Sequence, residues 1–231
     1  MRRLTPVLAA MAALAIAGPS PVPAQMGGQV GGAPMGGRPG SGPPAGETGF
    51  EAGPDKPDAA SKKAFNAGGK ALTKARGYDD AAAKAPNADK KAKELEKADD
   101  AYSRALDEFT EALSNKGDLF DAWNYAGSIH LRLGAFAESL DDYNHALNLK
   151  PDFMPAVEGR AEASLALNRL EEVRVAYMDL YSHAPDLAGK LMQAMQQWLT
   201  SHRQDGAVRP SDLDAMDKWL QERAVVAKAA P

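Results

Sequence analysis

The sequence contains no cysteine, which excludes disulfide bonds and thiolate chemistry from this chain. It also excludes the acylated cysteine that anchors a bacterial lipoprotein to its membrane. Basic residues are outnumbered as well, with 27 Lys and Arg against 31 Asp and Glu, and they form no extended stripe. Nucleic acid is therefore not an expected partner, because binding its phosphates requires a concentrated positive surface.

Long apolar runs are also missing. The longest, from Val7 to Ala17, is ended by Gly18 and Pro19. A membrane-spanning helix needs about 20 apolar residues, roughly twice the length of this run. We therefore expect no membrane span in this chain and interpret the run as part of a signal peptide rather than as an uncleaved anchor.

The N-terminal stretch has the features of a secretory signal peptide. Arg2 and Arg3 supply a basic start, the apolar run follows, and Ala24 ends a segment of small residues that a signal peptidase reads. We therefore predict a signal peptide over residues 1–24, with cleavage before Gln25. The composition, rich in Ala, Gly and Pro, favours a Gram-negative bacterium, so the expected localisation is periplasmic.

Recognisable catalytic and cofactor-binding motifs are absent. The chain has no HExxH sequence, no nucleophile elbow and no glycine-rich phosphate loop between a strand and a helix. Asp141 and His145 form an i,i+4 pair, but two ligands do not make a metal site, and the four histidines lack further partners at metal-ligand spacing. We therefore expect a non-enzymatic protein without a metal or cofactor.

Glycine and proline make up about half of residues 25–57, where apolar side chains are scarce. Such a segment cannot bury enough apolar surface to offset the entropy lost on ordering, so we predict a disordered linker. Two interpretations stay open. The linker is either a spacer that holds the folded part away from a membrane or partner, or a leader without a specific role.

Two stretches of the chain carry matching residue types in the same order and at a constant offset. The matched pairs are Trp123 and Val157, Gly127 and Ala161, Phe136 and Leu170, Tyr143 and Tyr177, Ala146 and Leu180, and Pro151 and Pro185. Large, small and helix-ending residues that recur with a period of about 34 residues indicate stacked helical hairpins. Arrays of this kind present surfaces to other molecules rather than reaction centres.

The segment Ala122–Pro151 resembles the tetratricopeptide repeat, because it carries that family's Trp, small residue, aromatic residue, Ala and terminal Pro. The resemblance implies an all-α, right-handed α-solenoid of about three helical hairpins with a C-terminal helical cap. In this frame the chain divides into an interrupted first hairpin (58–119), two repeats (120–153 and 154–186) and capping helices (187–231).

The first hairpin departs from this period. In the repeat frame Tyr78 and Ala81 begin the second helix. About a dozen additional residues then intervene, with Pro86 and Asn87 marking a break, and the pattern resumes at Tyr102. Asn87 is a candidate N-cap for a helix that runs to about Asn115. Gly117 is expected to end that helix in the left-handed conformation.

Two further helices are predicted after the last repeat. The apolar spacing indicates one helix that begins at Leu187, and another that follows Ser211 as its N-cap and runs to about Lys228. Trp198 and Trp219 lie on the apolar stripes of these helices. We expect both indoles in the core of the cap rather than in a ligand site.

The resemblance also implies that partner recognition occurs on the concave face, which the first helices of the repeats line in this family. The residues at the family's recognition positions include Lys63, Asn66, Lys70, Lys74, Asn124, Ser128, Arg132, Glu158 and Glu162. This face is expected to be basic at its N-terminal end and acidic at its far end. Such polarity orients a bound peptide of opposite charge order.

Two side chains of the repeats carry further expectations. Trp123 is expected in the core, where its replacement by Ala costs about 3–5 kcal/mol and unfolds the domain. Arg160 stands where the family prefers Leu. Either its stem packs while its guanidinium reaches solvent, or it pairs with Glu138 or Asp142.

These features predict a scaffold or adaptor that binds a protein or peptide partner in the cell envelope. The alternative is a structural assembly protein that self-associates into a homo-oligomer. Apolar residues expected at the surface of the cap, namely Met192, Leu199, Val225 and Val226, carry that alternative. A concentration-dependent mass favours self-association, whereas a monomer that captures an envelope protein favours the adaptor.

Overall fold

The computed structural model describes residues 58–229, which form eight α-helices and no strand. The predicted signal peptide and linker lie outside these residues. The helices are α2 (Ala59–Ala83), α3 (Ala88–Asn115), α4 (Phe120–Leu133), α5 (Phe136–Leu149), α6 (Met154–Ala166), α7 (Leu170–His183), α8 (Pro185–Asp205) and α9 (Pro210–Ala229). The predicted all-α class and the solenoid-like order of hairpins are confirmed.

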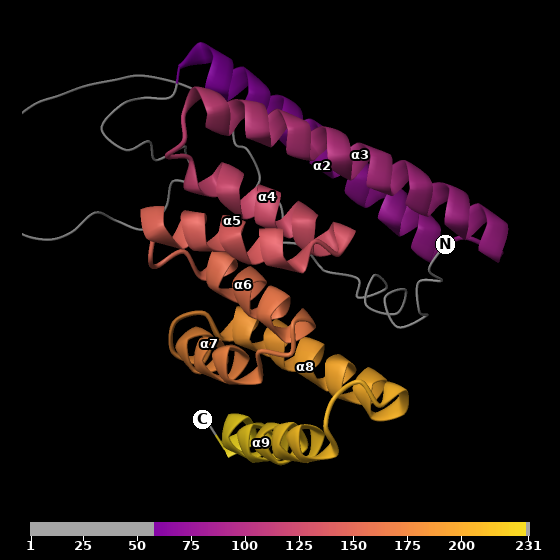
Figure 1. The fold of residues 1–231 in the computed structure, drawn as a ribbon, viewed down its shortest axis with the longest axis vertical. Coiled ribbons are helices and arrows are strands. Elements are labelled where there is room, and N and C mark those ends of the chain that lie inside the picture. Colours follow the sequence, from indigo (N-terminus) through magenta and orange to yellow (C-terminus); the bar gives the residue numbers. More distant parts are fainter. Residues whose placement is uncertain (1–57, 230–231) are drawn as a thin grey trace, which may run out of the picture.

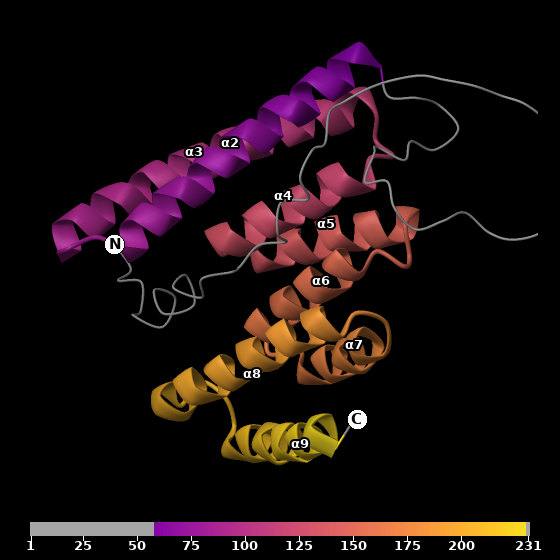
Figure 2. The ribbon, with the colours of Figure 1, turned by 180° about the vertical axis from the view of Figure 1, so that it is seen from behind.

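Consecutive helices pair as hairpins that stack along the long axis of the molecule (Figure 1). α2 packs with α3, α4 with α5 and α6 with α7, and each hairpin contacts the next. The first helices also touch one another, since α6 packs against both α4 and α8. Seen from behind, the long α2–α3 hairpin lies at one end of the stack and α9 at the other (Figure 2).

The first hairpin is longer than a repeat, and its break comes later than the repeat frame predicts. α2 continues without interruption for 25 residues, so Tyr78 and Ala81 belong to the first helix and the prediction that they begin the second is wrong. No helix-breaking proline interrupts this stretch before Pro86. The predicted cap is confirmed, because the Asn87 side chain accepts a hydrogen bond from the Lys90 amide at 2.9 Å.

The end of α3 differs from its predicted form. Its C-cap is Lys116 in an extended conformation, with φ −150° and ψ 103°. Among the described residues, the glycines with positive φ are Gly134 and Gly206, so the left-handed conformation predicted for Gly117 is wrong. The short segment to α4 therefore leaves α3 through extended backbone rather than through a left-handed turn.

The turns inside the two repeats have the same construction. Gly134, with φ 79°, follows α4, and Asn168, with φ 59°, stands one repeat period later, after α6. The Ala135 amide donates to the His130 carbonyl at 2.9 Å, and the Arg169 amide donates to the Ser164 carbonyl at 2.8 Å. The repeat thus preserves a left-handed position that Gly and Asn both tolerate.

Close packing in the cores depends on aromatic rings that lie directly against glycines. Tyr143, on α5, is 3% exposed. A Cβ added at Gly127 would stand 3.1 Å from its ring, and a Cβ at Gly159 would collide with the tip of the same ring. Phe109 covers Gly68 in the first hairpin in the same way. The prediction that a small residue at Gly127 allows close packing is confirmed.

Trp123 is less buried than the sequence predicts. Its indole is only partly buried and stacks on the His145 ring with centroids 4.4 Å apart. The indole N–H donates to the Gly117 carbonyl at 2.8 Å. Trp123 therefore closes the edge of the core, where part of its ring keeps contact with solvent, and the large core penalty expected for its removal is reduced.

The C-terminal helices match the predicted positions with one shifted boundary. α9 begins at Pro210, so Ser211 lies inside the helix instead of capping it. Trp198 is 2% exposed and its indole N–H donates to the Asn168 side chain at 3.2 Å, which confirms its place in the core. Trp219 is partly buried and meets the Tyr177 ring edge-on at 5.1 Å. Within residues 58–229, no helix combines the length and apolar character required to cross a membrane.

Candidate functional site

The candidate site is the surface formed by α2, α4, α6 and α8, which we call the first-helix face. It contains all nine residues predicted for partner binding. The four on α2 are solvent-exposed and form no hydrogen bond or ion pair with another described residue: Lys63, Asn66, Lys70 and Lys74. The α2 section of this face is therefore positively charged and open to solvent.

The α4 section is more enclosed. Asn124 is 4% exposed, and its side-chain amide has no hydrogen-bond partner among residues 58–229. The Ser128 hydroxyl donates to the Tyr125 carbonyl of its own helix at 2.8 Å. Of these two predicted residues, Asn124 therefore keeps all its side-chain donors and acceptors available, whereas the hydroxyl proton of Ser128 is already used in a hydrogen bond.

Arg132, the third predicted residue on α4, is engaged within the molecule. Its guanidinium donates to the two carboxylate oxygens of Asp79, at 3.1 Å from Nε and 2.5 Å from Nη2. The Tyr102 hydroxyl donates to the same carboxylate at 2.8 Å, and Asp99 lies 3.5 Å from the guanidinium. Burial and the hydrogen bond to Asp79 raise the pKa of Tyr102. This cluster joins α4 to the first hairpin.

Glu158 and Glu162 form the α6 section of the face, one helical turn apart. Glu158 is 7% exposed, and neither carboxylate has a hydrogen bond or ion pair with another described residue. Burial raises the pKa of Glu158. Burial, followed by the nearby charge of Glu158, raises the pKa of Glu162 to about 8. Lys190 on α8 opposes both shifts from a distance too long for an ion pair.

Tyr143 reaches the same place from α5. Its ring base lies over Gly127 of α4, and its hydroxyl end lies over Gly159 of α6, between the two glutamates in the sequence. The hydroxyl has no hydrogen-bond partner among residues 58–229. Burial and the charges of Glu162 and Glu158 raise its pKa well above the usual value.

Sequence reasoning placed Tyr143 in the framework and missed this hydroxyl. The signal available in the sequence was Gly159, a glycine inside a helix of otherwise larger residues. Arg76 on α2 and Lys190 on α8 were missed as well. Both contribute to the electrostatic field at this point, since Arg76 lowers the pKa of Tyr143 and Lys190 lowers that of Glu162.

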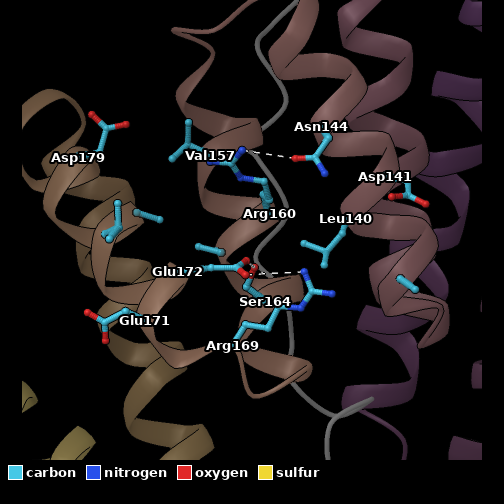
Figure 3. A pocket seen from close by; sticks show the side chains of 14 residues that line it. Leu140, Asp141, Asn144, Val157, Arg160, Ser164, Arg169, Glu171, Glu172 and Asp179 are labelled. Carbon is cyan, nitrogen blue, oxygen red and sulfur yellow. Dashed lines mark hydrogen bonds and ion pairs between the residues drawn. The ribbon is translucent and has the colours of Figure 1, made fainter.

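A hollow lies between α5 and α7, on the side of α6 that faces away from the first-helix face (Figure 3). Its volume is about 550 Å³, and its apolar walls include Leu140, Val157 and Ala161. Charged residues of both signs surround it: Asp141, Arg160, Arg169, Glu171, Glu172 and Asp179. The Glu172 carboxylate accepts a hydrogen bond from Ser164 at 3.0 Å, so part of this charge is already satisfied.

The structure decides between the two alternatives for Arg160. Its Nη1 lies 3.4 Å from the Asn144 side-chain oxygen, and no carboxylate of the described residues forms an ion pair with it (Figure 3). Asp142 is instead 2.6 Å from Nδ1 of His130, inside the α4–α5 hairpin. Arg160 therefore packs its stem at the hollow and keeps its guanidinium partly exposed.

The described residues contain no group of three or more His, Cys, Asp or Glu side chains placed to hold a metal ion. What the first-helix face offers is a set of largely buried side chains on α4, α5 and α6 whose polar atoms reach solvent and form no hydrogen bond within residues 58–229. Such groups bind complementary donors, acceptors or charges. They do not form a nucleophile with an adjacent base, which a covalent reaction requires.

Comparison with known families agrees with this geometry. The family model described as tetratricopeptide repeat matches residues 120–153, which contain α4, α5 and the turn after them. No curated protein matches the chain. The hairpin that supplies Asn124, Ser128 and Arg132 is thus similar to a tetratricopeptide repeat.

Proposed function

We propose that this protein is a non-enzymatic adaptor of the bacterial cell envelope that binds a segment of a partner protein along its first-helix face. Tetratricopeptide repeats generally mediate protein–protein interactions, and the matched hairpin contributes one section of that face. The predicted signal peptide, which lies outside the described residues, supports export to the periplasm.

One observation carries the proposal. Asn124 and Glu158 stand one repeat period apart, at the same place in successive hairpins, and both are more than nine-tenths buried without a side-chain hydrogen bond in the described chain. Although most of each side chain is buried, its polar atoms keep contact with solvent and are available to bond a ligand. A segment laid along α4 and α6 supplies the missing partners.

The charges along the face give the bound segment a direction. Lys63, Lys70 and Lys74 occupy its α2 end, and the unpaired carboxylates of Glu158 and Glu162 occupy its α6 end. A partner segment with acidic residues at one end and basic residues at the other is complementary to this order. Reversible docking of such a segment is the mechanism that we propose.

Affinity capture from envelope extract tests the proposal. The full chain is immobilised beside a variant with Lys63, Lys70 and Lys74 changed to Glu. A control variant carries the same change at Lys90, Lys91 and Lys93, which are exposed on α3. We expect mass spectrometry to identify a protein retained by the native chain and the control and lost by the first variant. Equal retention by all three contradicts docking at the basic end.

Self-association is the second candidate function. Val225 is 68% exposed, as this alternative requires. Leu199 is 6% exposed, so the expectation that it lies at the surface is wrong, and Met192 is partly exposed. The side chain of Val226 lies outside the described ones. Light scattering that gives a monomer mass over a hundredfold concentration range contradicts self-association, and a dimer that Val225→Asp dissociates supports it.

A further inference from the structure

We propose that Glu158, Glu162 and the hydroxyl of Tyr143 form a binding site for a cationic side chain, a lysine or an arginine, of the partner segment. This inference rests on the proposed function and specifies which residue type the acidic end of the first-helix face recognises. It assigns a binding role to Tyr143, a residue that the repeat pattern places in the core.

The first support is the pair of carboxylates. Glu158 and Glu162 are separated by one turn of α6, so they project from the same side of the helix. Glu158 is 7% exposed, and no donor among residues 58–229 forms a hydrogen bond or ion pair with either group. Like charges brought together and partly removed from water are unfavourable, and either an added proton or a bound cation relieves them.

The Tyr143 hydroxyl is an independent second support, because it comes from a different helix. Tyr143 is 3% exposed and its hydroxyl also lacks a hydrogen-bond partner among the described residues. Its tip reaches α6 only because Gly159 has no side chain, since a Cβ there would collide with the ring. The absence of a side chain at Gly159 thus lets the phenol oxygen reach α6 between Glu158 and Glu162 in the sequence, close enough for both charges to raise its pKa.

Three acceptors from two helices fit one kind of ligand. A lysine ammonium carries three N–H donors and an arginine guanidinium carries five, so either has enough donors for both carboxylates and the phenol oxygen. An anion would be repelled by Glu158 and Glu162. A divalent metal would lack ligands, since no third His, Asp or Glu in the described chain completes the group.

The charged groups around this site do not form ion pairs with its two glutamates. Lys190 on α8 and Arg76 on α2 contribute long-range positive potential, and Asp142 on α5 contributes negative potential. Neither Lys190 nor Arg76 forms an ion pair with the glutamates. The described part of the protein therefore supplies no cation to the site, and below about pH 8 Glu162 keeps its proton instead.

Selection from a library of random 12-residue peptides provides the test. The immobilised proteins are the native full chain, the variant Glu158→Gln/Glu162→Gln, and the control Glu138→Gln/Asp141→Asn. The control makes the same charge change at exposed positions of α5. Selection is done at about pH 8.5, above the pKa of Glu162, so that this carboxylate is mostly ionised.

We expect the native chain and the control to select peptides with Lys or Arg at one fixed position. Replacing that residue by norleucine should weaken binding to the native chain about tenfold and leave binding to Glu158→Gln/Glu162→Gln unchanged. Tyr143→Phe removes only the hydroxyl and should weaken binding of the cationic peptide by about threefold to tenfold, without affecting the norleucine peptide. Lys190→Gln removes the competing charge and should strengthen binding of the cationic peptide.

The possible failures are distinguishable. If the native chain retains no peptide, the proposed function is contradicted together with this site. If it retains peptides without an enriched cation, or if the α5 control loses binding as strongly as Glu158→Gln/Glu162→Gln, only the cation site is overturned. Circular dichroism of each variant verifies that the fold is intact, and Tyr143→Phe tests the site again should the double variant unfold.

Discussion

The guanidinium of Arg132 donates hydrogen bonds to both carboxylate oxygens of Asp79, a residue 53 positions earlier in the chain. The bond joins the C-terminal turn of α4 to the C-terminal part of α2 in the long first hairpin. Arg132 occupies a recognition position of the repeat family, yet in this protein its side chain holds two hairpins together. Partner binding by Arg132 stays a prediction, and any partner there competes with Asp79.

Replacing Asp79 by Ala should therefore destabilise the fold. The change leaves the half-buried Arg132 guanidinium and the Tyr102 hydroxyl without their shared acceptor, and we expect a loss of about 1–3 kcal/mol in unfolding free energy. Urea denaturation followed by circular dichroism measures this loss. Asp80→Ala, at the exposed neighbouring position, is the control, and an equal loss in both variants contradicts the structural role of the ion pair.

Stability should fall as pH rises from 5 to 9. The pKa of Glu162 is raised from 4.5 to about 8 in the folded chain, so between these values the folded state keeps a proton that the unfolded state has released. The free energy of unfolding therefore decreases across this window, by about 1–2 kcal/mol after allowance for solvent screening. Glu158, Asp121 and Asp142, whose pKa values burial also raises, act in the same direction.

Denaturation curves at several pH values check this trend. Glu162→Gln has no titrating proton at this position, so its stability should depend less on pH and should exceed that of the native chain at pH 9. A variant with the same pH dependence as the native chain contradicts the burial of a Glu162 carboxylate.

Alanine at two helical glycines should have opposite effects. Gly159→Ala places a methyl group against the buried Tyr143 ring, and we expect a loss of about 1–3 kcal/mol from overpacking. Gly189→Ala meets nothing within 4 Å on α8 and should raise stability by about 0.5–1 kcal/mol through higher helix propensity. Thermal melting compares the two, and a stabilised Gly159→Ala contradicts the close contact of α5 with α6.

Truncation of two aromatic residues should separate a core position from an edge position. Phe109 is fully buried, so Phe109→Ala should cost about 3–5 kcal/mol. Trp123 is only partly buried, and its replacement by Ala should cost less, about 2 kcal/mol, including the hydrogen bond to Gly117. Urea midpoints of the two variants measure the order, and a larger loss for Trp123→Ala contradicts it.

The repeat period predicted the fold well where chain length matches the period. Within 120–186 the turns, helix starts and buried aromatic residues of one repeat have counterparts one period away in the other. A single pattern therefore predicts the matching positions in both repeats. The left-handed turns at Gly134 and Asn168 are one example. In the first hairpin the pattern lacks this constraint, because additional helical turns shift every later residue. The misplacement of Tyr78 and Ala81 follows from that.

The candidate site was less predictable, because spacing gives the face on which a side chain lies and not the groups that meet it. Lysines on α2 are exposed as expected, since nothing later in the described chain packs over them. The engagement of Arg132 depends on Asp79, which reaches it only because α2 is unusually long. Likewise, the Tyr143 hydroxyl becomes a surface group only through a glycine on the following hairpin.

The length of the first hairpin determines where the structure opens locally. At one end of the hairpin α2 and α3 project past α4 and α5 (Figure 1), and from residue 83 to residue 97 no side chain is fully buried. The backbone amides of this projecting tip are protected only by the packing of α2 against α3. Their deuterium exchange should proceed through local fraying, in a gradient that slows toward Phe109, where the neighbouring hairpin adds its protection.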